Sequence, residues 1–210
     1  MKYKVMIVED QTMPRELFEL RVQASERFEL ALSIDNAALA DVYCLRFPVD
    51  LILMDVITRD GENGLDAAAR IKRAFPQIKI IIVTSMPECS YLSRAREIGV
   101  ESFWYKEEQR ESLLDVMERT MNGESVYPGA SPELTLGMAS SYQFTERELD
   151  ILREITSGDT NQEIADRLNM SVATVKTHIL NMLEKTGFRN RTELAVRARE
   201  SGLVILNRRN

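Results

Sequence analysis

The chain has 210 residues, an apolar fraction of 44% and a formal charge of −6. This length suggests one large or two small domains with a real hydrophobic core, and the acidic total excludes a uniformly basic nucleic-acid-binding surface. The charge is unevenly spread, because residues 1–122 carry −5, residues 123–141 carry −2 and residues 142–210 carry +1. This asymmetry predicts that the two ends are separate units.

Membrane and secretion signals are missing from the sequence. No apolar run approaches the length of a membrane span, and the N-terminus lacks the apolar core of a signal peptide. Cys44 and Cys89 show neither a CxxC motif nor metal-ligand spacing, so we expect two buried, reduced thiols. Together these features predict a cytoplasmic protein with no membrane partner.

The first 121 residues alternate between short apolar runs and helical segments. The runs expected to be strands are 5–8, 28–34 (an edge strand), 51–54, 79–83 and 102–105. Helices are expected from about residue 12, with Leu17, Leu20 and Val22 on one side, and over 37–47, 65–75, 88–98 and 113–121. Apolar runs without alternation are typical of strands covered on both faces. The alternation predicts an α/β fold with a doubly wound, five-stranded parallel sheet.

A second region begins after this alternation stops. Residues 122–143 are rich in Gly, Pro and Ser, which is typical of a linker, and beyond them we expect only helices. The predicted organisation is an α/β domain over 1–122, a linker over 123–142 and an all-α domain over 143–210.

Polar residues follow four of the predicted strands, namely Glu9 with Asp10, then Asp55, Thr84 and Lys106. The carboxyl ends of parallel strands meet at one edge of a sheet, where such folds bind ligands. Three carboxylates there would raise one another's pKa, and a Mg²⁺ ion would relieve the repulsion. Lysine and threonine can bind a phosphoryl group, so Asp55 is the predicted nucleophile of a phosphoryl-accepting site.

Each of these residues also has a simpler interpretation. A single acidic residue after a strand is more often a turn former or a helix cap, and a single lysine is more often a solvated surface charge. Their joint occurrence at successive strand ends favours the phosphoryl acceptor.

This pattern resembles the receiver domain of bacterial two-component response regulators over residues 3–121. The resemblance implies a flavodoxin-like fold in which Asp55 accepts phosphate from the phosphohistidine of a sensor histidine kinase. It implies that Mg²⁺ is bound by Glu9, Asp10, Asp55 and the backbone carbonyl of Ile57. It also implies that Thr84 turns toward the phosphate, that Lys106 contacts it, and that Phe103 moves with Thr84.

Two local departures from the receiver pattern concern the surroundings of this site. Ile57-Thr58-Arg59 replaces the usual Met-Pro, and the loop before Gly64 has about one extra residue. Lys106 is followed by Glu107-Glu108 instead of Pro or a small residue. Both departures bear on loop conformation, phosphate lifetime and kinase choice.

The C-terminal region is predicted to contain a helix-turn-helix. Thr145-Glu146-Arg147-Glu148 forms a capping box at the start of one helix, a short helix covers 161–168, and Ser171 caps a third helix ending near Gly187. On a helical wheel the third helix buries Val175, Ile179, Met182 and Leu183.

The opposite face of the third helix is the predicted DNA-reading surface. We expect base contacts from Lys176, Thr177 and Leu180 and phosphate contacts from the flanking cations. The complete predicted DNA-binding set is Thr174, Lys176, Thr177, Leu180, Asn181, Lys185, Arg189 and Arg191. A plain helical bundle is the alternative, favoured by the near-neutral charge. His178, the only histidine, is interpreted as structural or phosphate-contacting.

Residues 144–205 resemble the LuxR-type helix-turn-helix. The matching motifs are Thr145-Glu146-Arg147-Glu148, Asn161-Gln162-Glu163-Ile164-Ala165 and Thr174-Val175-Lys176-Thr177-His178. Their order after a receiver identifies the chain as a member of the NarL/FixJ class of response regulators. The resemblance implies base reading by positions 176, 177 and 180 and a dimer contact on the last helix, from residue 192 to about 201.

The expected function is therefore a transcriptional response regulator in which phosphorylation of Asp55 switches homodimerisation and binding to double-stranded DNA. It is expected to be a stoichiometric acceptor, not an enzyme, with at most slow self-dephosphorylation. One alternative is an aspartyl-phosphate enzyme of the haloacid dehalogenase kind, although Ile57 stands where that family has its general acid. Another alternative is a constitutive DNA binder whose receiver is never phosphorylated.

Overall fold

A computed structural model describes residues 2–59, 63–85, 90–106 and 111–204. The chain divides into two compact units, with the boundary between Ala130 and Ser131. No helix in these described ranges is long and apolar enough to cross a membrane. Each unit is described by itself below.

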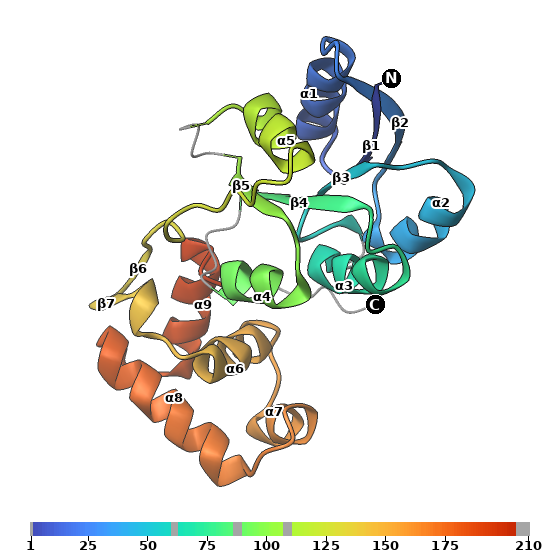
Figure 1. The fold of residues 1–210 in the computed structure, drawn as a ribbon. Coiled ribbons are helices and arrows are strands. Elements are labelled where there is room, and N and C mark those ends of the chain that lie inside the picture. Colours follow the sequence, from blue (N-terminus) through green and yellow to red (C-terminus); the bar gives the residue numbers. More distant parts are fainter. Residues whose placement is uncertain (1, 60–62, 86–89, 107–110, 205–210) are drawn as a thin grey trace. The chain divides into compact units, whose positions relative to one another are not determined.

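The first unit is built on a five-stranded parallel sheet, as the sequence predicts (Figure 1). Its strand order is β2-β1-β3-β4-β5, so β2 and β5 are the edge strands. The strands are β1 (Tyr3–Val8), β2 (Phe28–Ile34), β3 (Leu51–Met54), β4 (Lys79–Thr84) and β5 (Ser102–Tyr105). The central strands β3 and β4 are buried on both faces, which explains their unbroken apolar sequences.

Helices cover both faces of this sheet (Figure 1). The helices of the first unit are α1 (Thr12–Gln23), α2 (Ala40–Arg46) after the 3-10 turn η1 (Ala37–Leu39), α3 (Gly64–Ala74), α4 (Ser90–Ile98) and α5 (Leu113–Met121). Phe18 and Val22 of α1 pack with Val116 and Met117 of α5 against one face. Helices α2, α3 and α4 lie on the other face. This arrangement confirms the predicted doubly wound fold.

The inward face of α1 differs from the prediction. Leu17 and Leu20 are exposed, and Phe18 and Val22 are the buried residues. Residues 18 and 22 are four apart, so they share one side of a helix. Phe18 also makes an edge-on ring contact with Trp104 of β5. Tertiary packing on the aromatic strand therefore decides which side of α1 faces the sheet.

The second unit contains a short hairpin and four helices among its described residues. These elements are β6 (Thr135–Leu136), β7 (Ala139–Ser140), the 3-10 turn η3 (Ser141–Gln143), α6 (Glu146–Thr156), α7 (Asn161–Arg167), α8 (Val172–Thr186) and α9 (Arg191–Ser201). Side chains of Thr145, Thr160, Ser171 and Asn190 cap the four helices. Asn169 has a positive φ of 50° in the turn between α7 and α8. This conformation is tolerated better by Asn than by most residues and allows the tight helix-turn-helix corner.

The stretch predicted to be a linker is largely folded. Leu136 and Ala139 of the hairpin are buried in the same core as Leu149 and Val175. Met138 N–H donates to the Thr186 carbonyl at 3.0 Å, which joins the hairpin to the end of α8. The linker prediction is therefore wrong for this part of the stretch, because its small and apolar residues form a hairpin. The prediction that only helices follow residue 143 is confirmed for the described residues.

Cys44 does not match the prediction of a buried thiol. Cys44 is only half-buried and is a free thiol, and burial raises its pKa to about 11. Cys89 lies outside the described residues.

Candidate functional site

The predicted carboxylates meet at one edge of the sheet. Glu9, Asp10 and Asp55 each offer an oxygen within 4.8 Å of the others. Backbone hydrogen bonds continue the sheet past the strand ends and fix these positions, since Glu9 N–H donates to Ile34 and Asp55 N–H donates to Val8, both at 2.9 Å. The convergence results from parallel strands that end at the same level.

Lys106 is held between two of these carboxylates. Its Nζ lies 2.5 Å from Glu9 Oε2 and 2.9 Å from Asp55 Oδ2. Lys106 N–H also donates to the Thr84 carbonyl at 2.9 Å, which ties the end of β5 to the end of β4. The side chains of Glu9, Asp55 and Lys106 are 1%, 6% and 10% exposed, so water screens their charges poorly.

This burial shifts the protonation of the site. Desolvation raises the pKa of Asp55 to about 7, with Lys106 opposing the shift and Glu9 adding to it. Desolvation alone would lower the pKa of Lys106, but the carboxylates of Asp55 and Glu9 outweigh it and raise that pKa above its ordinary value. The ammonium group of Lys106 therefore faces three carboxylates, and the ionised form of Asp55 is disfavoured by burial.

The loop that follows Asp55 is tightly packed against it. Val56 N–H donates to Asp55 Oδ1 at 2.7 Å, and Gly64 N–H donates to the Val56 carbonyl at 2.8 Å. A Cβ atom on Gly64 would lie 1.8 Å from the Asp55 carbonyl oxygen, so only glycine allows this approach. Ile57 pairs with Asn63 through an antiparallel bridge. The extra loop residue inferred from the sequence falls in the stretch containing residues 60–62, which lie outside the described residues.

The two predicted switch residues are buried near the site. Thr84 is fully buried and pairs in register with Tyr105 of β5. Phe103 is 1% exposed, and its ring centroid lies 5.0 Å from that of Tyr105. Glu107 and Glu108, which distinguish this sequence from other receivers, lie outside the described residues.

The acidic cluster fits a small, hard cation. Its donors are carboxylate oxygens from Glu9, Asp10 and Asp55, which is the ligand type that Mg²⁺ prefers. The carboxylates outnumber the ammonium group of Lys106, so a divalent charge would offset the excess. The roles assigned to these three residues and to the Ile57 carbonyl in metal binding remain predictions.

One neighbour of the site escaped the sequence interpretation. Arg15 of α1 donates from its guanidinium to the Glu9 carbonyl at 3.1 Å. Its place one helical turn into α1, five residues after Asp10, was the available signal. The bond fixes the backbone from which Glu9 and Asp10 project.

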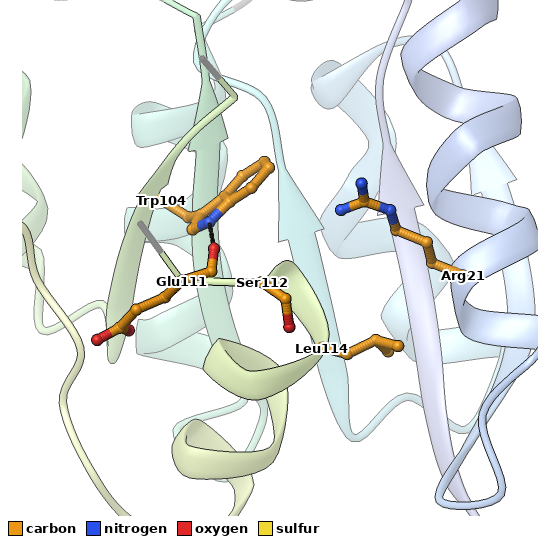
Figure 2. Close-up of a pocket in the computed structure, with 5 residues that line it drawn as sticks. All are labelled: Arg21, Trp104, Glu111, Ser112 and Leu114. Carbon is orange, nitrogen blue, oxygen red and sulfur yellow. Dashed lines mark hydrogen bonds between the residues drawn. The ribbon is translucent and has the colours of Figure 1, made fainter. Parts of the chain in front are cut away.

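A separate hollow of about 200 Å³ lies between α1, β5 and α5 (Figure 2). It is lined by Arg21, Trp104, Glu111, Ser112 and Leu114. Trp104 Nε1 donates to the Glu111 carbonyl at 3.0 Å, so the indole forms a fixed wall. The acidic cluster contributes nothing to this lining, and we assign the hollow no part in phosphoryl chemistry.

The third helix of the second unit has the two faces that its sequence predicts. Val175, Ile179 and Met182 of α8 are buried, and Leu183 is partly buried against the same core. Exposed residues on the other side are Ala173, Thr174, Lys176, Thr177, Leu180, Asn181 and Glu184. Leu180 is 60% exposed and lies in the middle of this face. His178 is only half-exposed at the flank.

The flanking cations of α8 differ in what they contact. Lys185 Nζ lies 2.7 Å from Glu148 Oε2 and 2.9 Å from the Gln143 carbonyl, so it joins α8 to α6. Arg191 donates to Asn161 and to the Asp159 carbonyl, which joins α9 to α7. The Arg189 side chain is exposed. Lys185 and Arg191 therefore have structural partners that the sequence did not reveal, and their DNA contacts remain predictions.

Comparison with known proteins agrees with this geometry. A family model described as "Response regulator receiver domain" matches residues 5–118, and one described as "Bacterial regulatory proteins, luxR family" matches residues 142–198. Response regulator protein VraR of Staphylococcus epidermidis is 33% identical over 97% of this chain and all of its own length. The VraR protein of Staphylococcus aureus is 32% identical over the same shares.

Solved structures show the same fold. RcsB from Salmonella enterica serovar Typhimurium, bound to promoter rprA in the presence of the phosphomimetic BeF₃⁻, superposes with a TM-score of 0.60. The match covers 93% of this chain and 98% of RcsB at 18% identity. The response regulator ChrA of a heme-sensing two-component system superposes with a TM-score of 0.52 at 21% identity, over 97% of this chain and 99% of ChrA. With a receiver sheet, its acidic edge and a LuxR-type helix-turn-helix in one chain, the protein belongs to the bacterial response regulators that combine a receiver with a LuxR-type DNA-binding domain.

Proposed function

We propose that Asp55 accepts a phosphoryl group from a sensor histidine kinase and that this phosphorylation controls dimerisation and DNA binding. The observation that supports this most directly is that Asp55 lies beside the Lys106 ammonium and in one acidic cluster with Glu9 and Asp10. A nucleophilic carboxylate, a buried ammonium group and spare acidic ligands are the parts that phosphoryl transfer requires.

In the proposed transfer a carboxylate oxygen of Asp55 attacks phosphorus while the phosphorus–nitrogen bond of the donor phosphohistidine breaks. The imidazole leaves with the electron pair of that bond. The Lys106 ammonium, 2.9 Å from Asp55 Oδ2, would stabilise negative charge on the transferred group. Mg²⁺ bound by Glu9, Asp10, Asp55 and the Ile57 carbonyl would supply charge neutralisation. The Thr84 hydroxyl and Phe103 would respond to the acyl phosphate.

A turnover enzyme is a weaker proposal. An aspartyl-phosphate hydrolase needs a general acid beside the nucleophile, and Ile57 stands two residues after Asp55 where such enzymes carry an Asp. We therefore propose a stoichiometric acceptor with at most slow self-dephosphorylation.

DNA binding is proposed for the exposed face of α8. This proposal is supported by the LuxR-type match over residues 142–198 and by the exposed Lys176, Thr177 and Leu180. It is also supported by the solved complex titled "Structure of two RcsB dimers bound to two parallel DNAs", whose protein superposes on this chain with a TM-score of 0.61. Double-stranded DNA and a second copy of the chain are the proposed partners.

The test is intact-protein mass spectrometry after incubation with acetyl phosphate and Mg²⁺. We expect the wild-type chain to gain one phosphoryl group, and we expect Asp55→Asn to gain none. Asp50→Asn is the matched control, because Asp50 precedes the same strand at its other end and accepts a hydrogen bond from Lys4 N–H at 2.8 Å. Phosphate that persists in Asp55→Asn, or that appears equally in EDTA, would overturn the assignment.

A further inference from the structure

The segment that follows α5 is attached to the edge of the receiver sheet. Phe103 N–H of β5 donates to the Val126 carbonyl at 2.8 Å, and Val126 N–H donates to Ser102 Oγ at 3.1 Å. Ser102 Oγ is also 2.7 Å from Thr120 Oγ1 of α5. An edge strand offers unpaired backbone groups, and here one chain segment occupies them.

Tyr127 adds side-chain contacts to this attachment. Its ring centroid lies 6.3 Å from that of Phe103, and the guanidinium of Arg96 in α4 lies 4.6 Å from the ring centroid. Its hydroxyl donates to the Val100 carbonyl at 2.8 Å. Residue 127 therefore contacts the predicted switch aromatic directly. We call residues 124–127 the β5 latch.

The attached latch leaves a short connection between the two units. The first unit extends to Ala130 and the second begins at Ser131, where the Tyr142 hydroxyl donates to the Ser131 carbonyl. Only residues 128–130 then join the latch to the second unit, a reach of roughly 10 Å at full extension. Detaching the latch would free residues 124–130 and extend that reach to about 25 Å.

A line of contacts leads from the phosphoacceptor edge to the latch. Thr84 pairs in register with Tyr105, the Tyr105 and Phe103 rings are 5.0 Å apart, and Phe103 contacts Tyr127. We propose that the β5 latch detaches from the sheet when phosphorylation of Asp55 moves Phe103. Its release then lengthens the connection to the DNA-binding unit. This inference rests on the proposed function, since it needs a phosphoryl group on Asp55.

The size of the latch suits such a role. Val126 accepts a hydrogen bond from Phe103 N–H and donates one to Ser102 Oγ, and it is the one latch residue whose side chain is buried in the core of the first unit. The other attachments are the contacts of Tyr127 and the ion pair of Glu124 with Arg119 at 2.8 Å. Segments with few buried contacts open at free energies far below global unfolding. A shift of the Phe103 ring would remove the ring contact of Tyr127 and strain the adjacent Phe103–Val126 hydrogen bond, so both attachments would weaken together.

Amide hydrogen exchange of the full chain tests this proposal. Peptides that cover 100–106 and 122–130 are followed with and without acetyl phosphate and Mg²⁺, and intact mass reports phosphate on Asp55 in the same samples. We expect phosphorylation to speed exchange of the Phe103 and Val126 amides by roughly tenfold or more. We expect Asp55→Asn to show no change.

Variants separate the latch from general destabilisation. Tyr127→Ala should speed exchange at both amides without phosphate. Tyr3→Ala is the matched control, because Tyr3 also lies against a phenylalanine and an arginine, Phe28 and Arg27, each at 6.0 Å. Tyr3 belongs to the β1–β2 pair, whereas the latch lies on β5 at the other edge of the sheet. Tyr127→Phe replaces the alanine variant if that variant does not fold. It loses only the hydroxyl bond to the Val100 carbonyl and should increase the exchange rate of both amides by a smaller factor.

The outcomes distinguish the two levels of proposal. Phosphate on Asp55 with unchanged protection of both amides would overturn the latch and leave the proposed function intact. Absence of phosphate would overturn the proposed function and with it the trigger of the latch. Equal effects of Tyr127→Ala and Tyr3→Ala on the two amides would also overturn the latch.

Discussion

Asp55 is an acidic side chain that the fold holds where its charge is unfavourable. It is 5% exposed at the end of β3, and burial raises its pKa to about 7. A group whose pKa is higher in the folded than in the unfolded chain binds its proton more tightly when folded. Its contribution to stability is therefore present at low pH and is lost as the pH rises from about 4 to about 7.

We expect Asp55→Asn to stabilise the metal-free protein in a pH-dependent way. At pH 8 the substitution removes a buried charge, so the melting temperature of the receiver should rise by roughly 5 °C in EDTA. At pH 5 the folded carboxyl is largely protonated, so the difference should fall to roughly a third of its value at pH 8. Thermal denaturation at both pH values is the measurement. Asp66→Asn, whose side chain is 57% exposed, is the control and should show no such trend.

A stabilisation of equal size at both pH values would contradict this prediction. It would mean that Lys106 keeps Asp55 ionised across the range and that burial does not dominate.

At the residue scale the sequence predicted the charged participants but not their partners. Glu9, Asp10, Asp55 and Lys106 could be predicted because each follows a strand, and parallel strands bring their ends together. The bond from Arg15 to the Glu9 carbonyl could not be predicted, because it depends on the angle at which α1 leaves the sheet. The order of the strands thus fixes where these side chains lie, whereas helix packing fixes which groups they contact.

At the scale of elements, the two lysines of α8 illustrate the same division. Lys176 is exposed on the predicted reading face, as the wheel requires. Lys185 instead contacts Glu148, which is 3% exposed. Burial alone would raise the pKa of Glu148, but the hydrogen bonds that Glu148 accepts from Lys185 and Thr145 outweigh burial and lower that pKa. A helical wheel gives the direction of a side chain from its own helix, whereas the partner from α6 depends on tertiary packing.

We therefore expect these lysines to behave differently when changed to alanine. Lys185→Ala leaves Glu148 without its cation and should lower the free energy of unfolding of the second unit by roughly 1–2 kcal/mol, a figure reduced for the partial exposure of the lysine. Lys176→Ala should leave stability unchanged and should lose roughly 1–3 kcal/mol of preference at one base pair. Chemical denaturation and binding titrations on single-base variants of the preferred site measure the two effects.

The opposite pattern would show that α8 is rotated relative to this assignment. Uniform loss of affinity for all sequences in Lys176→Ala would make that lysine a phosphate contact. A fully stable Lys185→Ala would show that the Glu148 contact contributes little to stability and would leave the predicted phosphate contact as the role of Lys185.

The segment between the domains shows where sequence patterns were least informative. Gly, Pro and Ser residues correctly located a boundary, but the predicted linker of 123–142 includes the latch contacts of Val126 and Tyr127 and the buried hairpin residues Leu136 and Ala139. Each of these contacts depends on a partner far along the chain or in another element. Local composition therefore identified the boundary but overestimated the length of chain that is free.

In the whole molecule, the chain runs from the latch to the second unit through residues 128–130. Phosphorylation of the first unit can change DNA binding by the second only if the two states of the receiver restrict the second unit to different degrees. A short connection is a physical means of coupling, because it restricts the second unit while the latch is attached. Lengthening the connection should then have the same effect as opening the latch.

An insertion of six residues of Gly and Ser after Gly129 would lengthen the connection while the latch stays attached. The longer connection should raise the DNA affinity of the unphosphorylated chain toward that of the phosphorylated wild type, within the 5–150-fold range typical of coupling between sites. Phosphorylation of Asp55 should be retained, since the insertion leaves the acidic cluster untouched. The same six residues inserted at Glu26, in the exposed turn between α1 and β2, are the control and should leave the phosphate dependence unchanged. Affinity is measured by titration of a DNA site at fixed salt, with intact mass reporting phosphate. If the insertion after Gly129 left the full phosphate dependence in place, coupling would come from phosphate-driven dimerisation and not from the length of the connection.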